Sequence, residues 1–483
     1  MWRHLFLWFL LAVDCAIHAQ STNTLRISCS STNLLLEWPA TITSLALQSA
    51  VSLSSAWQTV TNPCVLSNDT YRVSVPEPSS TRYFRLGATV APDSMTGKLL
   101  MGYQGWFACP GDGSPMNKWV HWFANNTPNA TNVTVDFWPD ISELDPDELF
   151  ATGMTMSNGS PARVYAAWNQ KTVLRHFRWM RDNNLDGVFL QRFTSELKTS
   201  SNFAWRNKVA ANVRLGAETY GRVFAIMYDI SGQDEATLIS TLTNDWAYLT
   251  ATLQVTNSPR YLRHRGKPVV AIWGFGFTSR VNTPAEALTA ISFFKAAGCT
   301  VMGGVPTYWR TLTRDSQTNA AWAAAYRSFD VLSPWSVTRF SDQAGADTFT
   351  STVTVPDLAD CSSHGIDYMP VLFPGFSWHN LDESYPLNQI PRQGGAFYWR
   401  QAYNAVRVGC TMLYGAMFDE MNEGTSMFKM APTRAELPAQ GTFVPLNIDG
   451  QQLPTDWYLR LADQAGRMLR HEIPLQWQMP IKP

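Results

Sequence analysis

Apolar runs that alternate with helical patterns constrain the fold of this chain more than any other feature of its sequence. Between residues 98 and 483, eight short runs rich in β-branched and aromatic residues recur, and helical spacing fills most of the intervals. Eight strands that alternate with helices are typical of a (β/α)8 barrel. We therefore predict an α/β fold, a (β/α)8 TIM barrel, for residues 98–483. The predicted strands are Leu99–Phe107, Gly187–Gln191, Val223–Tyr228, Val269–Trp273, Val301–Val305, Val331–Trp335, Tyr368–Phe373 and Met412–Phe418.

Helical signals separate these strands. The segment Gln170–Asn184 repeats apolar residues at spacings of three and four, which predicts an amphipathic helix. Thr283 and Glu286 form a capping box around Pro284, so we expect a helix to begin there and to end at Gly298. Further predicted helices are Asp234–Leu253, Asn319–Arg327, Gly395–Val408 and Thr455–His471. A ninth strand candidate, Val133–Trp138, is interpreted as part of an inserted extension.

The N-terminal part of the chain differs in composition from the predicted barrel. Residues 20–89 are rich in Ser, Thr and Val, and short strand-like runs separated by turn residues predict a small all-β, sandwich-like accessory domain. Residues 90–97 serve as a linker. Residues 1–19 combine a basic start, the apolar run Leu5–Val13 and small residues up to Ala19, which predicts a signal peptide and a secreted or periplasmic protein. The alternative for this segment is a buried N-terminal helix.

Charge and cysteine usage exclude several classes of partner. The chain has 37 Lys and Arg against 38 Asp and Glu, a formal net charge of -1. We expect no nucleic-acid partner, because such proteins need a basic excess or stripe. We also expect no membrane span, because no later apolar run reaches about 18 residues. The cysteines lack metal-ligand spacing, so we predict neither a metal nor a cofactor. Whether Cys29 pairs with Cys64 stays open.

Polar and aromatic residues follow nearly every predicted strand. In a barrel the strand ends and the loops after them build the active site on one face. Hydroxyl-binding polar groups beside flat apolar rings suit a sugar, and the 20 Trp residues supply such rings. The alternative is that single Trp and Tyr residues cap the barrel structurally. The predicted substrate-binding residues are Tyr103, Gln104, Trp106, Gln191, Arg192, Tyr228, Asp229, Trp273, Tyr308, Trp309, Trp335, Trp378, His379, Asp419 and Asn422.

An acidic cluster follows the eighth predicted strand. Asp419, Glu420 and Glu423 place three carboxylates within five residues, directly after an apolar run. Such crowding raises the pKa of a carboxyl group, as a general acid at neutral pH requires. Cleavage of a glycosidic bond commonly uses two carboxylates, and we predict Glu420 and Glu423 as this catalytic pair. The alternatives are a solvated acidic loop and a Ca²⁺ site.

The segment Phe418–Thr425 resembles the Asn-Glu-Trp-x-Glu-Gly-Thr signature of glycoside hydrolase family 99, the endo-α-mannosidases and mannanases. It is more similar still to bacterial family 71/99-like proteins, often labelled xylosidase/arabinosidase. The resemblance covers about residues 98–472. Other stretches that carry it are Gly102–Phe107, Asp136–Asp140, Asp186–Phe193 and Pro391–Trp399.

The resemblance implies a function and a mechanism. It implies an exported glycoside hydrolase in which Glu420 is the base that takes the proton of the sugar's own 2-hydroxyl. Glu423 would be the acid that protonates the leaving group and later activates water, so that two displacements retain the anomeric configuration. Asp419 replaces the family's Asn, and Met421-Asn422 replaces its Trp-containing pair. We therefore predict only an α-linked oligo- or polysaccharide of mannan, α-glucan or arabinoxylan type. The alternative is a non-catalytic glycan-binding protein on the same barrel.

Overall fold

The computed structural model describes residues 25–30, 32–39, 45–52, 58–60, 62–68 and 70–483. The predicted signal peptide, residues 1–19, therefore lies outside the described residues. Two compact units divide the chain: an N-terminal unit extends to Leu86, and a larger unit runs from Gly87 to Pro483. Within the described residues, no helix has the length and apolar character needed to cross a bilayer.

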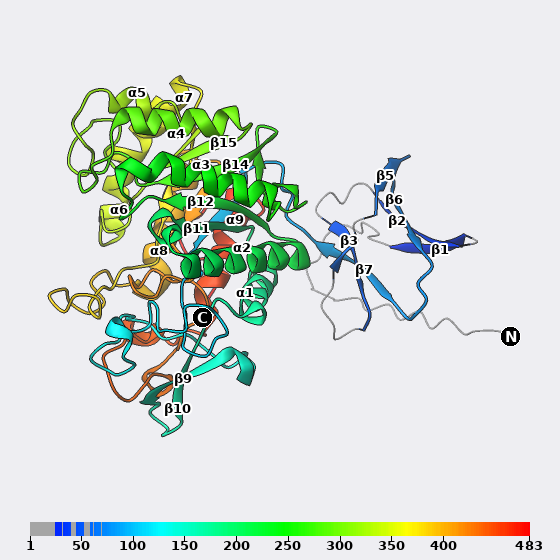
Figure 1. Cartoon of the computed structure of the whole chain (residues 1–483), viewed down its shortest axis with the longest axis horizontal. Helices are drawn as coiled ribbons and strands as arrows, with labels where there is room; N and C mark the ends of the chain where they lie inside the picture. Colours follow the sequence, from blue (N-terminus) through cyan, green and yellow to red (C-terminus); the bar gives the residue numbers. More distant parts are fainter. Residues whose placement is uncertain (1–24, 31, 40–44, 53–57, 61, 69) are drawn as a thin grey trace. The chain divides into compact units, whose positions relative to one another are not determined.

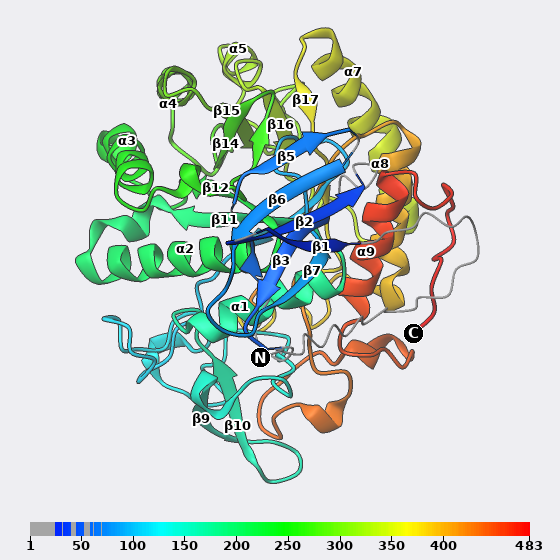
Figure 2. The same cartoon turned by 90° about the vertical axis from the view of Figure 1, so that its right-hand side faces the viewer.

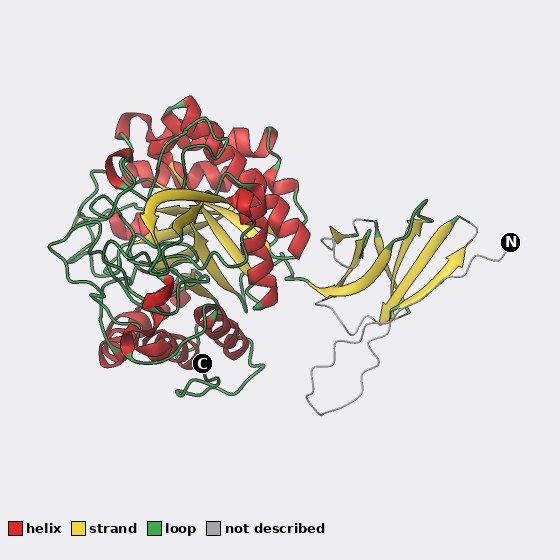
Figure 3. Cartoon of the chain, turned by 90° about the horizontal axis from the view of Figure 1, so that it is seen from below, coloured by secondary structure: helices red, strands yellow, loops and turns green. Residues whose placement is uncertain are grey.

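A curled sheet of parallel strands forms the centre of the larger unit (Figures 1 and 3). Its neighbouring strands are hydrogen-bonded in the order β17-β16-β15-β14-β12-β11-β8-β19-β18. The strands are β8 (Leu99–Tyr103), β11 (Gly187–Phe193), β12 (Val223–Asp229), β14 (Lys267–Trp273), β15 (Thr300–Val305), β16 (Val331–Pro334), β17 (Asp367–Tyr368), β18 (Val371–Leu372) and β19 (Leu413–Gly415). Each coincides with one of the eight predicted strands, with β17 and β18 as two halves of the seventh.

The two edge strands of this sheet belong to one continuous segment. The Met369 N–H donates to the Leu332 carbonyl on β16 at 2.9 Å, whereas the Pro370 carbonyl accepts from the Tyr414 N–H on β19 at 3.0 Å. Residues 367–372 thus hydrogen-bond to β16 on one side and to β19 on the other. This segment therefore links the first and last strands of the sheet. Because the strands are parallel, their carboxyl ends all lie at one face.

Helices surround the sheet, as Figure 2 shows. They are α1 (Gln170–Asp182), α2 (Ser200–Tyr220), α3 (Glu235–Ala251), α4 (Pro284–Ala296), α5 (Trp322–Tyr326), α6 (Gln343–Phe349), α7 (Val355–Ser363), α8 (Ala396–Arg407) and α9 (Trp457–Leu469). Helix α4 begins as predicted, because Thr283 and Glu286 cap each other's main-chain N–H around Pro284. Helices α2, α6 and α7 are not among the predicted ones.

The ninth predicted strand is wrong. Residues 133–138 form only an isolated bridge, between Phe123 and Val133. Their alternating apolar side chains are buried, but the Asp136 N–H donates to the carbonyl of Met421, in a loop, instead of to a neighbouring strand. The extension instead contains an antiparallel hairpin of β9 (Leu149–Thr155) and β10 (Pro161–Tyr165).

The N-terminal unit consists of strands. Its four-stranded antiparallel sheet has the order β1-β2-β6-β5, and a small core forms around Leu36, Trp38 and Val73. Its strands are β1 (Arg26–Ser30), β2 (Asn33–Pro39), β3 (Leu45–Ala50), β5 (Cys64–Ser67), β6 (Thr70–Pro76) and β7 (Tyr83–Ala88); β4 (Gln58–Thr59) has two residues.

Cys29 and Cys64 are free and lie on opposite edges of this sheet, on β1 and β5. Three strand spacings of about 4.8 Å separate these edges by roughly 14 Å. A disulfide requires Cα atoms within about 7 Å. The distance across this sheet therefore excludes a disulfide between Cys29 and Cys64.

Candidate active site

The acidic segment Asp419–Glu423 follows β19 at the carboxyl-terminal face of the sheet. The Phe418 N–H donates to the Gly102 carbonyl at 2.7 Å, which continues the pairing of β19 with β8 up to the start of the segment. Asp419 and Glu420 are each only 1% exposed, and Glu423 is half-buried. The three carboxylates are therefore held in the protein rather than on a solvated loop, which excludes one of the alternatives for this cluster.

Asp419 anchors the loop after β8. Its two carboxylate oxygens accept from the main-chain N–H groups of Gln104 at 2.7 Å and Gly105 at 2.8 Å. Gly105 has a φ of +52°, and a Cβ there would lie 2.8 Å from a Val209 methyl, so only glycine fits this turn. Burial raises the pKa of Asp419 to about 6, while the two N–H donors act in the opposite direction. Asp419 therefore positions the site rather than facing a substrate.

Glu420 accepts hydrogen bonds on both oxygens. Its Oε2 accepts from the Gln104 Nε2 at 2.9 Å, and its Oε1 accepts from the main-chain N–H groups of Asn422 at 3.0 Å and Glu423 at 3.3 Å. Three N–H donors aimed at one carboxyl group favour its ionised form. They also occupy the oxygens that a Ca²⁺ ion would need, which argues against the calcium alternative.

Glu423 has a different environment. In the described part of the chain, its hydrogen bonds are made by its main chain, and no protein donor reaches its carboxyl group. Burial and the charge of Asp229 raise the pKa of Glu423 to about 7. Burial, Glu423 and Asp419 raise the pKa of Glu420, whereas the main-chain N–H groups of Glu423 and Asn422 act in the opposite direction. Because the N–H donors all serve Glu420, we infer that a single proton shared by the pair resides on Glu423.

Asp229 is a further buried carboxylate on this face. It ends β12, and its Oδ1 accepts from the Ser231 N–H at 2.7 Å. Burial raises the pKa of Asp229 to about 6. Because its charge also raises the pKa of Glu423, Asp229 belongs to the electrostatics of the pair.

Aromatic rings border the same face. Trp273 and Trp335 are half-buried and meet edge to face at 5.6 Å, and Trp335 lies 6.5 Å from the Tyr414 ring on β19. The Gln191 Nε2 donates to the Tyr414 hydroxyl at 2.9 Å, which places this predicted residue under the rings. The indole N–H of Trp273 is buried without a hydrogen-bond acceptor in the described structure.

Two other predicted tryptophans already stack on protein rings. Trp106 lies parallel to His121 with 3.7 Å between ring centroids, and Trp378 stacks on Tyr385 at 5.4 Å. One face of each indole is therefore covered, although both indole N–H groups are buried and unpaired among the described residues. These two residues can offer a hydrogen bond more readily than a stacking surface.

Several predicted substrate-binding residues have fully buried side chains whose polar atoms are bound within the protein. Arg192 pairs with Asp245 at 2.5 Å, and the Tyr228 hydroxyl donates to the same carboxylate at 2.8 Å. The Tyr103 hydroxyl bonds the His176 ring at 2.9 Å, and the Trp309 indole donates to Asp357 at 3.0 Å.

Three more predicted residues have other partners than the carboxylates of the acidic segment. The Asn422 amide donates to the carbonyls of His121 and Thr134, both at 2.9 Å. His379 binds through its main chain to Asp136 at 2.8 Å. Tyr308 lines a separate surface hollow, where Arg314 lies over its ring at 4.5 Å.

The sequence reading missed other residues that shape the site. Tyr414 interrupts an apolar strand, a signal that could have been used. Asp136, Ser377 and Arg392 are distant in sequence from the acidic segment, and only the folded chain brings them against it or against the turn that follows it. Across the residues that the structure covers, no group of three or more His, Cys, Asp or Glu side chains could hold a metal ion.

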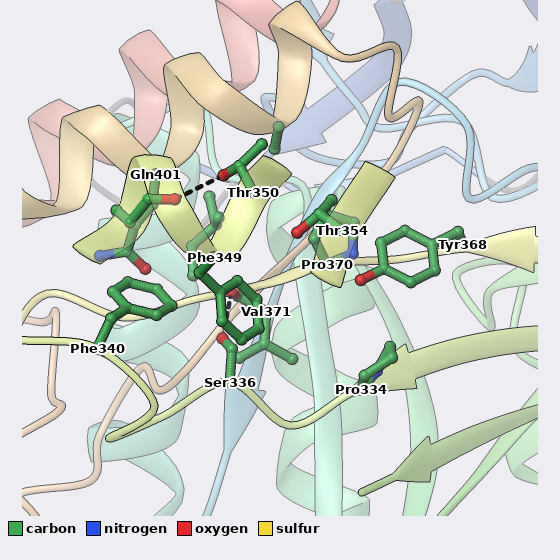
Figure 4. Close-up of a pocket in the computed structure, with 13 residues that line it drawn as sticks. Pro334, Ser336, Phe340, Phe349, Thr350, Thr354, Tyr368, Pro370, Val371 and Gln401 are labelled. Atoms are coloured by element: carbon green, nitrogen blue, oxygen red, sulfur yellow. Dashed lines mark hydrogen bonds between the residues drawn. The ribbon is translucent and has the colours of Figure 1, made fainter. Parts of the chain in front are cut away.

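A small cavity lies elsewhere in the larger unit, between strands β16–β18 and helices α6 and α8 (Figure 4). With a volume of about 20 Å³ it has room for about one water molecule. The Ser336 hydroxyl on its wall donates to the Val371 carbonyl at 2.8 Å, and Thr350 donates to the Ala346 carbonyl at 2.8 Å. None of the acidic residues lines this cavity, so it is not a candidate for the active site.

Comparisons with known proteins define the fold. No family model matches the sequence, and no curated protein matches it. Two similar solved structures are those of the GH99 endo-alpha-mannosidase from Bacteroides thetaiotaomicron, one of them in complex with bis-tris propane. Each has a TM-score of 0.54 and 14% sequence identity, and the alignment covers 78% of this chain and 99% of that chain. The predicted α/β fold is thus confirmed as a curled parallel sheet with surrounding helices, of the (β/α)8 type found in glycoside hydrolases.

Proposed function

We propose that this protein is a glycoside hydrolase that cleaves α-linked oligo- or polysaccharides. The observation that carries this proposal is the asymmetry of the Glu420–Glu423 pair. Three N–H donors surround one carboxyl group, and none reaches the other. A base and an acid side by side are what glycosidic cleavage requires. The similar fold of an endo-alpha-mannosidase supports the proposal.

The proposed reaction has two displacements. In the first, Glu420 takes the proton of the sugar's 2-hydroxyl while that oxygen bonds to the anomeric carbon. The bond from this carbon to the leaving oxygen breaks, and Glu423 protonates that oxygen. In the second, Glu423 takes a proton from water, and the water oxygen bonds to the anomeric carbon while the bond between this carbon and the 2-oxygen breaks and Glu420 returns its proton to the 2-oxygen. Two inversions retain the configuration.

The surroundings of the pair suit a neutral sugar. Trp273 and Trp335 are half-buried aromatic rings of the kind on which a sugar can pack. The net charge of -1 provides no strong field for a charged polymer. We keep mannan, α-glucan and arabinoxylan-type glycans as substrate classes, with α-mannosides as the first to test.

The test is the release of reducing sugar from α-mannans, α-glucans and arabinoxylans by the full chain. We expect activity in the wild type, loss of it in Glu423→Gln with glycan binding retained, and wild-type activity in the control Glu383→Gln, which changes an exposed carboxylate. A wild type that binds glycans but cleaves none over a wide pH range would instead identify a non-catalytic glycan-binding protein.

Export is a separate part of the proposal, motivated by residues 1–19. N-terminal sequencing of the mature protein from a bacterial secretion host tests it. We expect the chain to begin after Ala19; a mature protein that retains Met1 in the cytoplasm would contradict export.

A further inference from the structure

Arg392 is a buried cation beside the acidic segment. It is 3% exposed, and among the described residues it forms no ion pair. Its guanidinium lies over the Phe137 ring at 4.3 Å and over the Tyr458 ring at 4.5 Å. Burial lowers the pKa of Arg392 to about 10, so the group stays charged at neutral pH. Burying a charge is unfavourable unless its surroundings compensate for lost hydration, and here two aromatic faces do so in part.

The guanidinium binds the main chain directly after Glu423. Its Nη2 donates to the Gly424 carbonyl at 2.9 Å and to the Ser426 carbonyl at 2.7 Å. Gly424 has a φ of +63°, and a Cβ there would lie 2.8 Å from the Ser377 nitrogen. The turn after Glu423 is therefore packed tightly against the loop that follows β18, with Arg392 bridging its two carbonyls.

Asp136 holds the other side of Glu423. This fully buried carboxylate accepts from the Ser377 hydroxyl and from the main-chain N–H groups of His379 and Asn380, both at 2.8 Å. The Ser377 N–H in turn donates to the Glu423 carbonyl at 3.0 Å. Asp136 is followed by Phe137, the ring on which Arg392 stacks. Two segments about 250 residues apart thus meet around one glutamate.

We infer that Asp136, Phe137 and Arg392 form a clamp that positions Glu423. The Glu423 carboxyl has no protein hydrogen bond of its own among the described residues, so its place depends on how firmly its main chain is held. A displacement of about 1 Å at a reacting group can cost about 100-fold in rate. The clamp gives a role to the stretches around Asp136 and Arg392, and it rests on the proposed function of Glu423.

Arg392→Lys tests the clamp in the full chain. An ammonium cannot reproduce the planar guanidinium that stacks on two rings while bridging two carbonyls. We expect kcat to fall about 10- to 100-fold while KM changes less than about twofold, because the substrate-binding rings are untouched. Arg434→Lys, at an exposed arginine, is the matched control with unchanged kinetics. Unchanged kcat in Arg392→Lys would overturn the inference.

Chemical rescue distinguishes positioning from general stability. In Arg392→Gly, guanidinium ion at low millimolar concentration should restore kcat several-fold, whereas the same concentration of sodium chloride should not. Absence of rescue in a variant that melts like the wild type would count against the clamp. Where Arg392→Gly fails to fold, Asp136→Asn replaces it: kcat should fall with KM nearly constant, and unchanged kcat would overturn the clamp.

A readout without substrate separates this inference from the proposed function. Crystal structures of the wild type and Arg392→Lys should show the Glu423 carboxyl displaced or spread over several positions, with Asp419 unmoved on Gln104 and Gly105. An unmoved Glu423 would overturn the clamp even in an active enzyme. A displaced Glu423 in a chain that cleaves no glycan would support the clamp and refute the hydrolase.

Discussion

Two clusters of buried charge lie at strand ends of the same sheet, and they differ in how far their charges are compensated. At the end of β11, Arg192 forms a buried ion pair with Asp245 of helix α3, and Asn207 and Tyr228 complete their hydrogen bonds. After β19, Asp419, Glu420 and Glu423 crowd like charges, and this crowding raises the pKa of Glu420. The first cluster is satisfied and holds β11 and β12 to helix α3. The second keeps three carboxyl groups with raised pKa values, a destabilising arrangement that the proposed function would explain.

The largest expected effect comes from neutralising Glu420 or Glu423, the proposed catalytic pair. Glu423→Gln and Glu420→Gln should each lower kcat by about 10²- to 10⁴-fold, because each removes a proton-transfer group. Both variants should be at least as stable as the wild type, since Glu420→Gln removes a charge from a buried cluster and Glu423→Gln preserves the neutral form of the side chain. Steady-state kinetics and urea unfolding measure the two effects. A substantial loss of stability in both would show that the pair is structural.

A single substitution in the Arg192–Asp245 cluster should instead lower the stability of the protein. Asp245→Asn leaves Arg192 buried without its counter-ion, and we expect about 3–5 kcal/mol loss of unfolding free energy. Urea unfolding followed by tryptophan fluorescence gives this value. Loss below about 1 kcal/mol would place the ion pair among the weakly contributing ones.

The pH dependence of kcat/KM should distinguish the roles of Glu420 and Glu423. The alkaline limb of kcat/KM should report the loss of the Glu423 proton, with a pKa of about 7. Asp229→Asn removes a negative charge that raises this pKa, so the limb should move to lower pH. An alkaline limb that stays in place in Asp229→Asn would separate Asp229 from the pair.

Stability should follow the same titration. The folded pKa of Glu423 lies above its unfolded value, so the folded state binds more protons between the two. The free energy of unfolding should therefore fall as pH rises from about 4.3 towards 7. Glu423→Gln should flatten this slope, as thermal melting across the range can show. A slope identical in the two proteins would contradict the raised pKa.

The smallest expected effect concerns the rings. Trp273→Ala should raise KM about 3- to 10-fold, since an aromatic stacking contact contributes about 0.5–1.5 kcal/mol. The measurement is KM on the best glycan of the panel, with kcat as the internal reference. An unchanged KM would place the sugar elsewhere on this face.

Much of the fold, and the acidic segment itself, could be predicted from short-range sequence patterns. The eight strands were predictable because their apolar runs are short, β-rich and separated by helical spacing. The acidic segment was predictable because three carboxylates directly follow such a run. Helix α2 escaped prediction because Arg206, Asn207 and Asn212 are buried on it and interrupt its apolar spacing.

The remaining features depend on partners distant in sequence. Val133, Val135 and Phe137 alternate like a strand, yet their N–H groups meet no neighbouring strand. Arg192 and Trp309 lie at strand ends, as active-site residues do, but their buried side chains are hydrogen-bonded to Asp245 and Asp357. A pattern along the chain gives the position of a side chain at a strand end, whereas its role depends on which distant group binds it.

The most direct test of the central claim is a neutron crystal structure of the wild type, grown in deuterated solution at a pH below the Glu423 pKa of about 7. We predict a deuteron on the Glu423 carboxyl group and none on Glu420, whose oxygens accept from Gln104, Asn422 and Glu423. A deuteron on Glu420 beside an ionised Glu423 would contradict the assignment of base and acid.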